Sequence, residues 1–168
     1  MMFIRSGKVI VRARLAIAFL LLLVVFSISA AAQTVDFSGT WTLNKAASKM
    51  ADQFSMAPTN IKIVQRANTL DIERHSNFQG NDLTVKDKFT LDGKESINPD
   101  WADSQKRSIA AWSDDKASLV ITTKISLGDN GEMTIIEVYR LKDKQLVIEA
   151  RSSSFFDEVA ETLVFDKK

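Results

Sequence analysis

The chain has 168 residues, of which 22 are basic and 21 acidic, with a single histidine and no cysteine. The near balance of charge, with no basic stripe, argues against a nucleic-acid-binding protein. Without cysteine the chain can have neither disulfides nor a lipid-modified N-terminal cysteine. Stability must therefore come from an apolar core, which a chain of this length is able to bury.

The first 32 residues have the layout of a secretory signal peptide. Four basic residues without an acidic one precede an apolar run, 15–26, and the small residues Ala30 and Ala32 fit a signal peptidase site. We therefore expect cleavage before Gln33, export to the periplasm or the cell exterior, and no membrane attachment afterwards. The alternative is an uncleaved membrane anchor, because about twenty apolar residues can span a bilayer.

The remaining residues, 33–168, are predicted to form one domain. Its length is close to the usual size of a single domain. Loss of four basic residues with the signal peptide would leave 18 basic and 21 acidic residues, a net charge of −3. Nothing in this balance indicates an acidic or basic partner, and the oligomeric state stays open.

The segment Asp36–Asn44, directly after the apolar run, is predicted to be the first strand. Its residues alternate between an apolar and a polar parity, which is typical of a strand with one buried face. The buried parity consists of Phe37, Gly39, Trp41 and Leu43.

The following segment, 45–58, is rich in helix formers. Ala46, Met50 and Phe54 recur every four residues, so a short helix could pack that face on the sheet, and Pro58 would end it. An irregular loop is the equal alternative. A lid over a cavity is a third interpretation.

From Asn60 onward the chain alternates between short β-type segments and turn sequences such as Asp92-Gly93. The predicted strands span residues 61–66, 70–75, 83–91, a short piece of 96–103, 105–112, 117–127, 132–141, 145–153 and 160–166. We therefore expect an all-β fold, an antiparallel up-and-down β-barrel of eight to ten strands, because closure removes the exposed sheet edges. A two-sheet sandwich is the structural alternative.

The motif Phe37-Ser38-Gly39-Thr40-Trp41, placed right after a signal peptide, resembles the opening motif of the lipocalins and related calycin barrels. Together with Leu91–Glu95 and Glu137–Leu141, it makes the chain similar to bacterial secreted lipocalin-like domain proteins. The resemblance implies a lipocalin-like barrel that binds a small molecule.

The same resemblance implies structural roles for two motif residues. Gly39 would allow a close approach between the strand and the chain that crosses the barrel floor, and Trp41 would plug that end. In lipocalins a late arginine packs over the tryptophan as a cation–π contact. Arg140 and Arg151 are the two candidates for that arginine.

Few residues are available for catalysis. His75 falls on the polar parity of its strand and is expected to face solvent. With one histidine and no cysteine, the common zinc sites and the Ser-His or Cys-His nucleophile systems cannot be assembled within the chain. The sequence therefore favours a protein that is not an enzyme, leaves catalysis by a pair of its 21 acidic residues open, and predicts no metal and no cofactor.

Five polar residues lie on otherwise apolar parities and are predicted to point into the barrel: Gln65, Arg74, Asp87, Thr123 and Glu137. Buried charges must be paired or face water or a ligand. One interpretation is an internal salt bridge from Arg74 to Asp87 or Glu137, and bulges or strand ends are another. The functional interpretation is that Arg74 neutralises an acidic ligand group, by analogy with related fatty-acid-binding barrels.

Three functions are considered at this stage, and the least favoured is an enzyme, a barrel that acts on its ligand without a histidine triad. The first is an exported protein that reversibly binds a small apolar or amphipathic ligand inside the barrel, with Arg74, Phe89, Thr123 and Tyr139 as the ligand-binding residues. The second is a non-catalytic structural or protein-interaction barrel of the cell envelope with a filled interior. The aromatic residues Phe78, Trp112, Phe155 and Phe156 would rim the mouth in the first case, and the alternative is that they are core or end-plug residues.

Overall fold

The computed structural model describes residues 34–51, 55, 57–78, 80–100, 104–155 and 157–168. The predicted signal peptide, 1–32, lies outside these residues. Within the described ranges, no helix is both long and apolar enough to cross a membrane.

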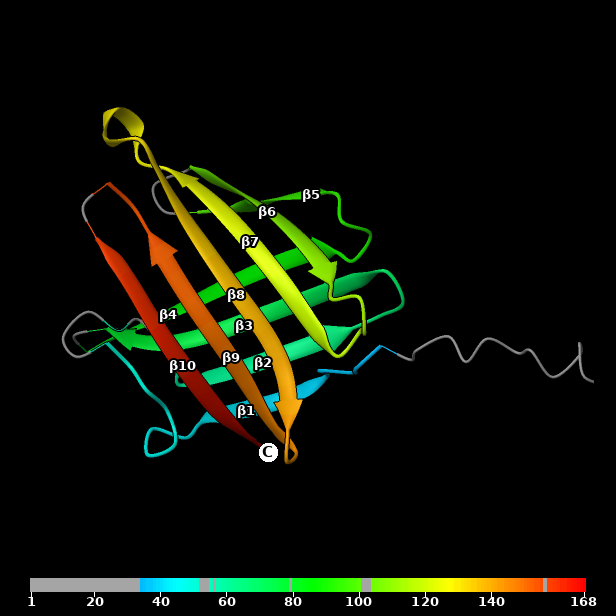
Figure 1. Cartoon of the computed structure of the whole chain (residues 1–168). Coiled ribbons are helices and arrows are strands. Elements are labelled where there is room, and N and C mark those ends of the chain that lie inside the picture. Colours follow the sequence, from blue (N-terminus) through cyan, green and yellow to red (C-terminus); the bar gives the residue numbers. More distant parts are fainter. Residues whose placement is uncertain (1–33, 52–54, 56, 79, 101–103, 156) are drawn as a thin grey trace, which may run out of the picture. The chain divides into compact units, whose positions relative to one another are not determined.

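The described chain forms one ten-stranded antiparallel sheet (Figure 1). The strands are β1 (Gly39–Leu43), β2 (Asn60–Gln65), β3 (Thr69–Phe78), β4 (Asn81–Thr90), β5 (Glu95–Pro99), β6 (Gln105–Trp112), β7 (Ser118–Ser126), β8 (Glu132–Lys142), β9 (Gln145–Ser153) and β10 (Glu158–Lys167). Consecutive strands pair with each other except β4 and β5, and β1 also pairs with β10, so the order is β4-β3-β2-β1-β10-β9-β8-β7-β6-β5 with β4 and β5 as the two edges. The predicted all-β, up-and-down barrel is confirmed, and it is nearly closed.

Alternation of side chains along the strands produces the barrel. On β7, for example, Leu119, Ile121 and Thr123 are buried while the residues between them are partly exposed. Turn residues separate the strands as the sequence predicts, and Gly93 adopts a φ of 75°, which glycine accepts without strain. The period-2 pattern places the apolar parity of the strands on the concave face, so curling of the sheet into a barrel buries it.

The up-and-down topology defines two ends of the barrel. The floor end carries the connections β2–β3, β4–β5, β6–β7 and β8–β9, and the mouth end carries the connections β1–β2, β3–β4, β5–β6, β7–β8 and β9–β10. The short 3-10 helix η2 (Gly128–Asn130) belongs to the β7–β8 connection at the mouth end.

The predicted helix within 45–58 is not observed among the described residues of that segment. The chain instead turns at 45–47 and runs along β10, where the backbone N–H and C=O of Lys49 pair with those of Thr162. Pairing with β10 satisfies backbone groups that a helix would have satisfied internally. The alternative of an irregular loop is therefore correct for the described part, while Phe54 lies outside it.

The floor end is closed by residues that precede β1. Phe37 is fully buried, and its ring stacks on Trp112 at 5.8 Å and meets Tyr139 edge-on at 6.1 Å. Trp41 Nε1 donates a hydrogen bond to the carbonyl of Phe37 (3.0 Å). The Gln65 side chain accepts from Phe37 N (3.0 Å) and holds this crossing segment against β2. Of the two interpretations of Trp112, the end-plug position is correct and the rim of the mouth is not, because its ring stacks on Phe37 at the floor.

The cation over Trp41 is Lys167, not an arginine. Its Nζ lies 5.3 Å from the centre of the indole ring, whereas Arg140 and Arg151 pair with glutamates on the outer face of the sheet. Gly39 makes room for this contact, since a Cβ at Gly39 would lie 2.8 Å from Lys167 Cε and the backbone φ there is 147°. The close neighbour of Gly39 is therefore a side chain of β10 rather than the crossing chain.

Side chains close the seam between β4 and β5, the two edge strands. The amide of Asn98 accepts from Lys88 N (2.8 Å) and donates to Lys88 O (3.1 Å), as a neighbouring peptide group would. Ser96 Oγ accepts from Thr90 N (3.0 Å). Both side chains are buried, so these bonds satisfy strand-edge groups that would otherwise be unpaired.

Replacement of Asn98 by alanine is expected to open this seam locally. Two buried hydrogen bonds would be lost and the Lys88 backbone groups left unpaired, at a cost of about 1–3 kcal/mol in the free energy of unfolding. Amide hydrogen exchange should become faster at Lys88 and stay unchanged at Ile63, in the middle of paired strands. Unchanged exchange at Lys88 would show that Asn98 does not close the seam.

Candidate functional site

The interior of the barrel has two different halves. In the floor half the inward-facing side chains are fully buried, among them Trp41, Leu70, Phe89, Leu119, Leu146 and Phe165. In the mouth half the inward-facing apolar side chains remain partly exposed: Leu83, Val85, Ile125, Met133, Ile135, Ala150 and Val159. Apolar surface facing inward without complete burial is what a small ligand would cover.

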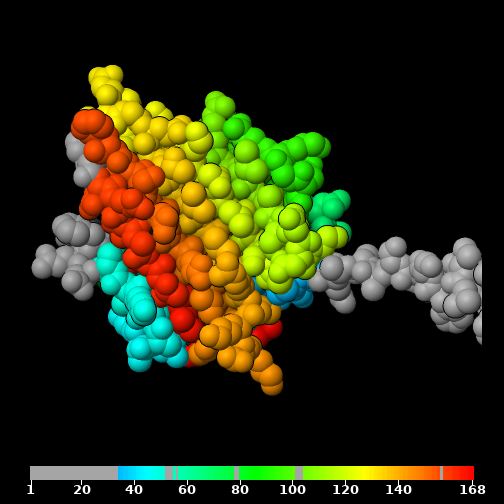
Figure 2. Space-filling model, in the orientation of Figure 1, coloured from blue at the N-terminus to red at the C-terminus, as the bar shows by residue number. Residues whose placement is uncertain are grey.

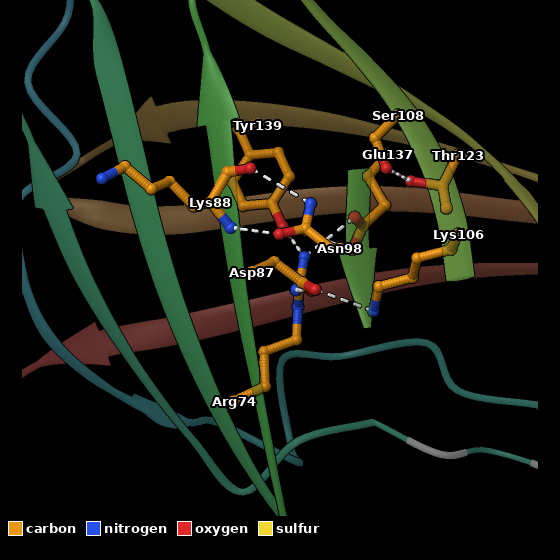
Figure 3. A network of polar contacts seen from close by, with 9 residues as sticks. All are labelled: Arg74, Asp87, Lys88, Asn98, Lys106, Ser108, Thr123, Glu137 and Tyr139. Atoms are coloured by element: carbon orange, nitrogen blue, oxygen red, sulfur yellow. Dashed lines mark hydrogen bonds and ion pairs between the residues drawn. The ribbon is translucent and has the colours of Figure 1, made fainter. Parts of the chain in front are cut away.

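A cluster of polar side chains separates the two halves, and Arg74 of β3 is its centre (Figure 3). Arg74 Nη1 donates to Asp87 Oδ2 (2.7 Å), and Nη2 donates to Glu137 Oε2 (2.9 Å) and Tyr139 Oη (2.7 Å). Tyr139 Oη in turn donates to Glu137 Oε1 (3.2 Å). The sequence-based interpretation of an internal salt bridge is thus confirmed for both carboxylates.

A second cation completes the cluster. Lys106 Nζ of β6 lies 2.8 Å from Asp87 Oδ1, so this carboxylate of β4 is held by Arg74 on one oxygen and by Lys106 on the other. The four charged side chains are all at least four-fifths buried, with exposures between 3% and 17%. Two formal positive charges and two formal negative charges balance, which is the condition under which buried charges are tolerated.

Burial and neighbouring charges fix the protonation of two members of the cluster. Burial lowers the pKa of the Arg74 guanidinium, but the charges of Glu137 and Asp87 and the contact with Tyr139 outweigh this and raise it above its ordinary value. Burial also raises the pKa of the Tyr139 phenol, against the opposing effect of Arg74. Arg74 therefore stays charged, and Tyr139 keeps the proton that it donates to Glu137.

The four residues expected to bind a ligand do not form one group. Arg74 and Tyr139 are in direct contact, and the Thr123 hydroxyl forms a 2.9 Å hydrogen bond with Ser108. Phe89 is packed into the core of the floor half, next to Leu70 across the β3–β4 pair. Their role in binding stays a prediction. Arg74 and Thr123 lie nearest to the mouth half, in register with Val85 and Ile135, whereas Tyr139 is in register with Leu119 of the floor half.

Two members of the site are missing from the sequence-based set, Lys106 and Asn98. Lys106 shares the parity of Ser108, Ala110 and Trp112 on β6, and this alternation was the signal that could have identified it as inward-facing. Asn98 gave a weaker signal, because a strand of five residues ending at Pro99 is too short for a clear alternation.

Two surface grooves lie on the outer side of the barrel. One, of about 430 Å³, lies along the outer side of β8, β9 and β10 on the face shown in Figure 2, with Ile136, Val138 and Ala160 among its lining residues. The other, of about 330 Å³, follows the outer side of β2, β3 and β4. His75 also faces outward, where it contacts Thr84 and Glu73. Among the described residues, no three histidines or carboxylates are grouped to hold a metal ion.

Comparison with known proteins identifies the fold. No family model and no curated protein matches the sequence. Zebrafish ileal bile acid-binding protein in complex with cholic acid is similar in structure (TM-score 0.55, 16% identity, covering 79% of this chain and 98% of that one). Lipid binding protein 8 of Caenorhabditis elegans has a TM-score of 0.57 at 12% identity, with 79% and 95% coverage.

A third similar structure is a secretory abundant heat soluble protein from Ramazzottius varieornatus (TM-score 0.55, 10% identity, 82% of this chain and 98% of that one). All three share the antiparallel barrel at low sequence identity. The described chain therefore has the fold of the calycin-type β-barrels.

Proposed function

We propose that this protein reversibly binds a small apolar or amphipathic molecule in the mouth half of the barrel. The observation that carries the proposal is the ring of inward-facing apolar side chains, including Val85, Ile125 and Ile135, that remains partly exposed above the polar cluster. Proteins of similar fold support it, since their names describe binding of bile acids and fatty acids.

Native mass spectrometry of the protein isolated from its own host tests this function. The expected result is an additional mass that is lost on extraction with organic solvent. A protein that carries no such mass, and that also fails to bind a neutral fluorescent dye such as Nile red, would contradict the proposal. This result would favour the second function, a barrel that binds another protein. The fully packed floor half and the outer groove of β8–β10 are the observations that support that function.

Two neighbouring residues of β8 distinguish the interior from the outer groove. Ile135 faces inward in the mouth half, whereas Ile136 faces outward and is 39% exposed. The substitution Ile135→Trp is expected to lower dye affinity about tenfold or more by filling the mouth half. The matched control Ile136→Trp should leave the dye affinity unchanged. Loss of affinity in Ile136→Trp but not in Ile135→Trp would place the ligand in the outer groove. Thermal melts of both variants check folding.

We also propose that the protein is exported and that its first 32 residues are removed. The support is the arrangement of basic residues, apolar run and small residues that the sequence shows. N-terminal sequencing of the protein from its host is expected to begin at Gln33. Recovery of an intact Met1 in the membrane fraction would contradict cleavage and favour the anchored form.

A further inference from the structure

The polar cluster of Arg74, Asp87, Lys106 and Glu137 leaves no surplus positive charge for an acidic ligand. Each cation is already engaged by a carboxylate at 2.7–2.9 Å, and the formal charges cancel. Arg74 contacts two protein carboxylates, Asp87 and Glu137. A carboxylate ligand would have to compete with both of them for the guanidinium.

One further acidic residue, Glu161, adds negative charge to the mouth half. Glu161 shares the inward parity of Leu163 and Phe165 on β10 and also borders the outer groove of β8–β10. It is in register with Ala150 and, through it, with Glu137. Its Oε1 accepts a hydrogen bond from the Ala51 backbone (2.8 Å). With Glu161 included, the inward-facing charged residues of the mouth half and the cluster carry a net formal charge of −1 within the described strands.

From these charges we propose that the barrel selects neutral amphipathic ligands, with a hydroxyl or carbonyl head group, over carboxylates of the same chain length. This inference rests on the ligand-binding function proposed above. A carboxylate entering the mouth half would lose water and meet no unpaired cation, whereas a hydroxyl can donate to Glu137 and accept from Lys106 at little electrostatic cost.

The polar groups that a head group would reach are those at the border of the mouth half. Glu137 and Lys106 keep 17% and 11% of their side chains exposed, and the ammonium of Lys106 has three donors for its one ion-pair partner in the described structure, Asp87. A hydroxyl is small enough to use these groups without breaking the bonds around Arg74. The chain of the ligand would then lie against Val85, Ile125 and Ile135.

A matched pair of competitors tests the inference. Nile red bound to the full-length protein is displaced with dodecan-1-ol or with dodecanoate at about pH 8, where the acid is ionised. The concentration of dodecan-1-ol that displaces the dye is expected to be at least about tenfold lower than that of dodecanoate. Equal or stronger displacement by dodecanoate overturns the inference and leaves the proposed function intact. No displacement by either, with no dye bound, overturns both.

The variant Glu137→Gln is expected to shift this preference. Removing one carboxylate charge leaves the cluster with a surplus cation, so affinity for dodecanoate should rise about tenfold while that for dodecan-1-ol changes little. The control Glu132→Gln alters the same strand at an outward, half-exposed position and should change neither affinity.

A second variant keeps the test informative if Glu137→Gln does not fold. Glu161→Gln removes a charge at the mouth without touching the ion pairs of Arg74, and it should also raise dodecanoate affinity. If folded variants at both positions leave the ratio of the two affinities unchanged, charge balance does not set the selectivity and the inference is wrong.

Discussion

Replacement of Trp41 by alanine is expected to lower the free energy of unfolding by about 3–5 kcal/mol. Trp41 is 1% exposed, its Nε1 donates to the Phe37 carbonyl, and Lys167 lies over its ring. Alanine would leave a cavity at the floor, an unpaired buried carbonyl and an ammonium without its aromatic partner. Urea denaturation followed by circular dichroism measures the loss.

The variant Trp41→Phe separates packing from the hydrogen bond. Phenylalanine keeps most of the buried aromatic surface but cannot donate to Phe37 O, so the loss should fall to about 1–3 kcal/mol. Because Trp41 lies in the floor half, ligand affinity per folded molecule should stay unchanged in both variants. A loss below about 1 kcal/mol for Trp41→Ala would show that the floor does not depend on this ring.

Replacement of Arg74 by methionine is expected to cost about 3–5 kcal/mol of unfolding free energy, because it leaves buried carboxylates without their partner. Asp87 would keep Lys106, but Glu137 would retain only the Tyr139 hydroxyl. The buried cluster therefore makes Arg74 a structural residue whatever its role in binding. Denaturant titration of wild type and variant measures the difference.

The double variant Arg74→Met with Glu137→Gln tests the cause of that loss. If the unpaired Glu137 carboxylate is responsible, the double variant should lose about 0.5–3 kcal/mol less than the sum of the two single variants. Arg140→Met serves as the exposed control, since Arg140 pairs with Glu149 at the surface and should contribute no more than about 1 kcal/mol. Strict additivity would show that the ion pair contributes nothing to stability.

Most of the strand positions could be predicted from the sequence, because side-chain alternation and turn chemistry are local properties. Predicted and observed strands agree to within a few residues, for example 105–112 for β6 and 145–153 for β9. The segment 45–58 was ambiguous because local sequence does not show what a segment pairs with. Its helix formers predict a helix locally, but pairing with β10, more than 110 residues away, satisfies its backbone instead.

The candidate site was only partly predictable. Parity identified Arg74, Asp87 and Glu137 as inward-facing, since it depends only on the neighbours of each residue along its own strand. Parity cannot show that Lys106 reaches Asp87 or that Lys167, rather than Arg140 or Arg151, covers Trp41. Those contacts depend on which strands become neighbours and on the tilt with which the sheet closes.

The sequence by itself thus determined the all-β class, the approximate strands and most of the residues that point inward, because each follows from a period of two along the chain. Only the tertiary structure decided the balance of charge inside the barrel. Arg74 and Glu137 are 63 residues apart and meet through the register of the closed sheet. From the sequence alone, Arg74 is a candidate anion-binding residue. In the folded barrel the register brings carboxylates to it, and Arg74 becomes the centre of a neutral cluster.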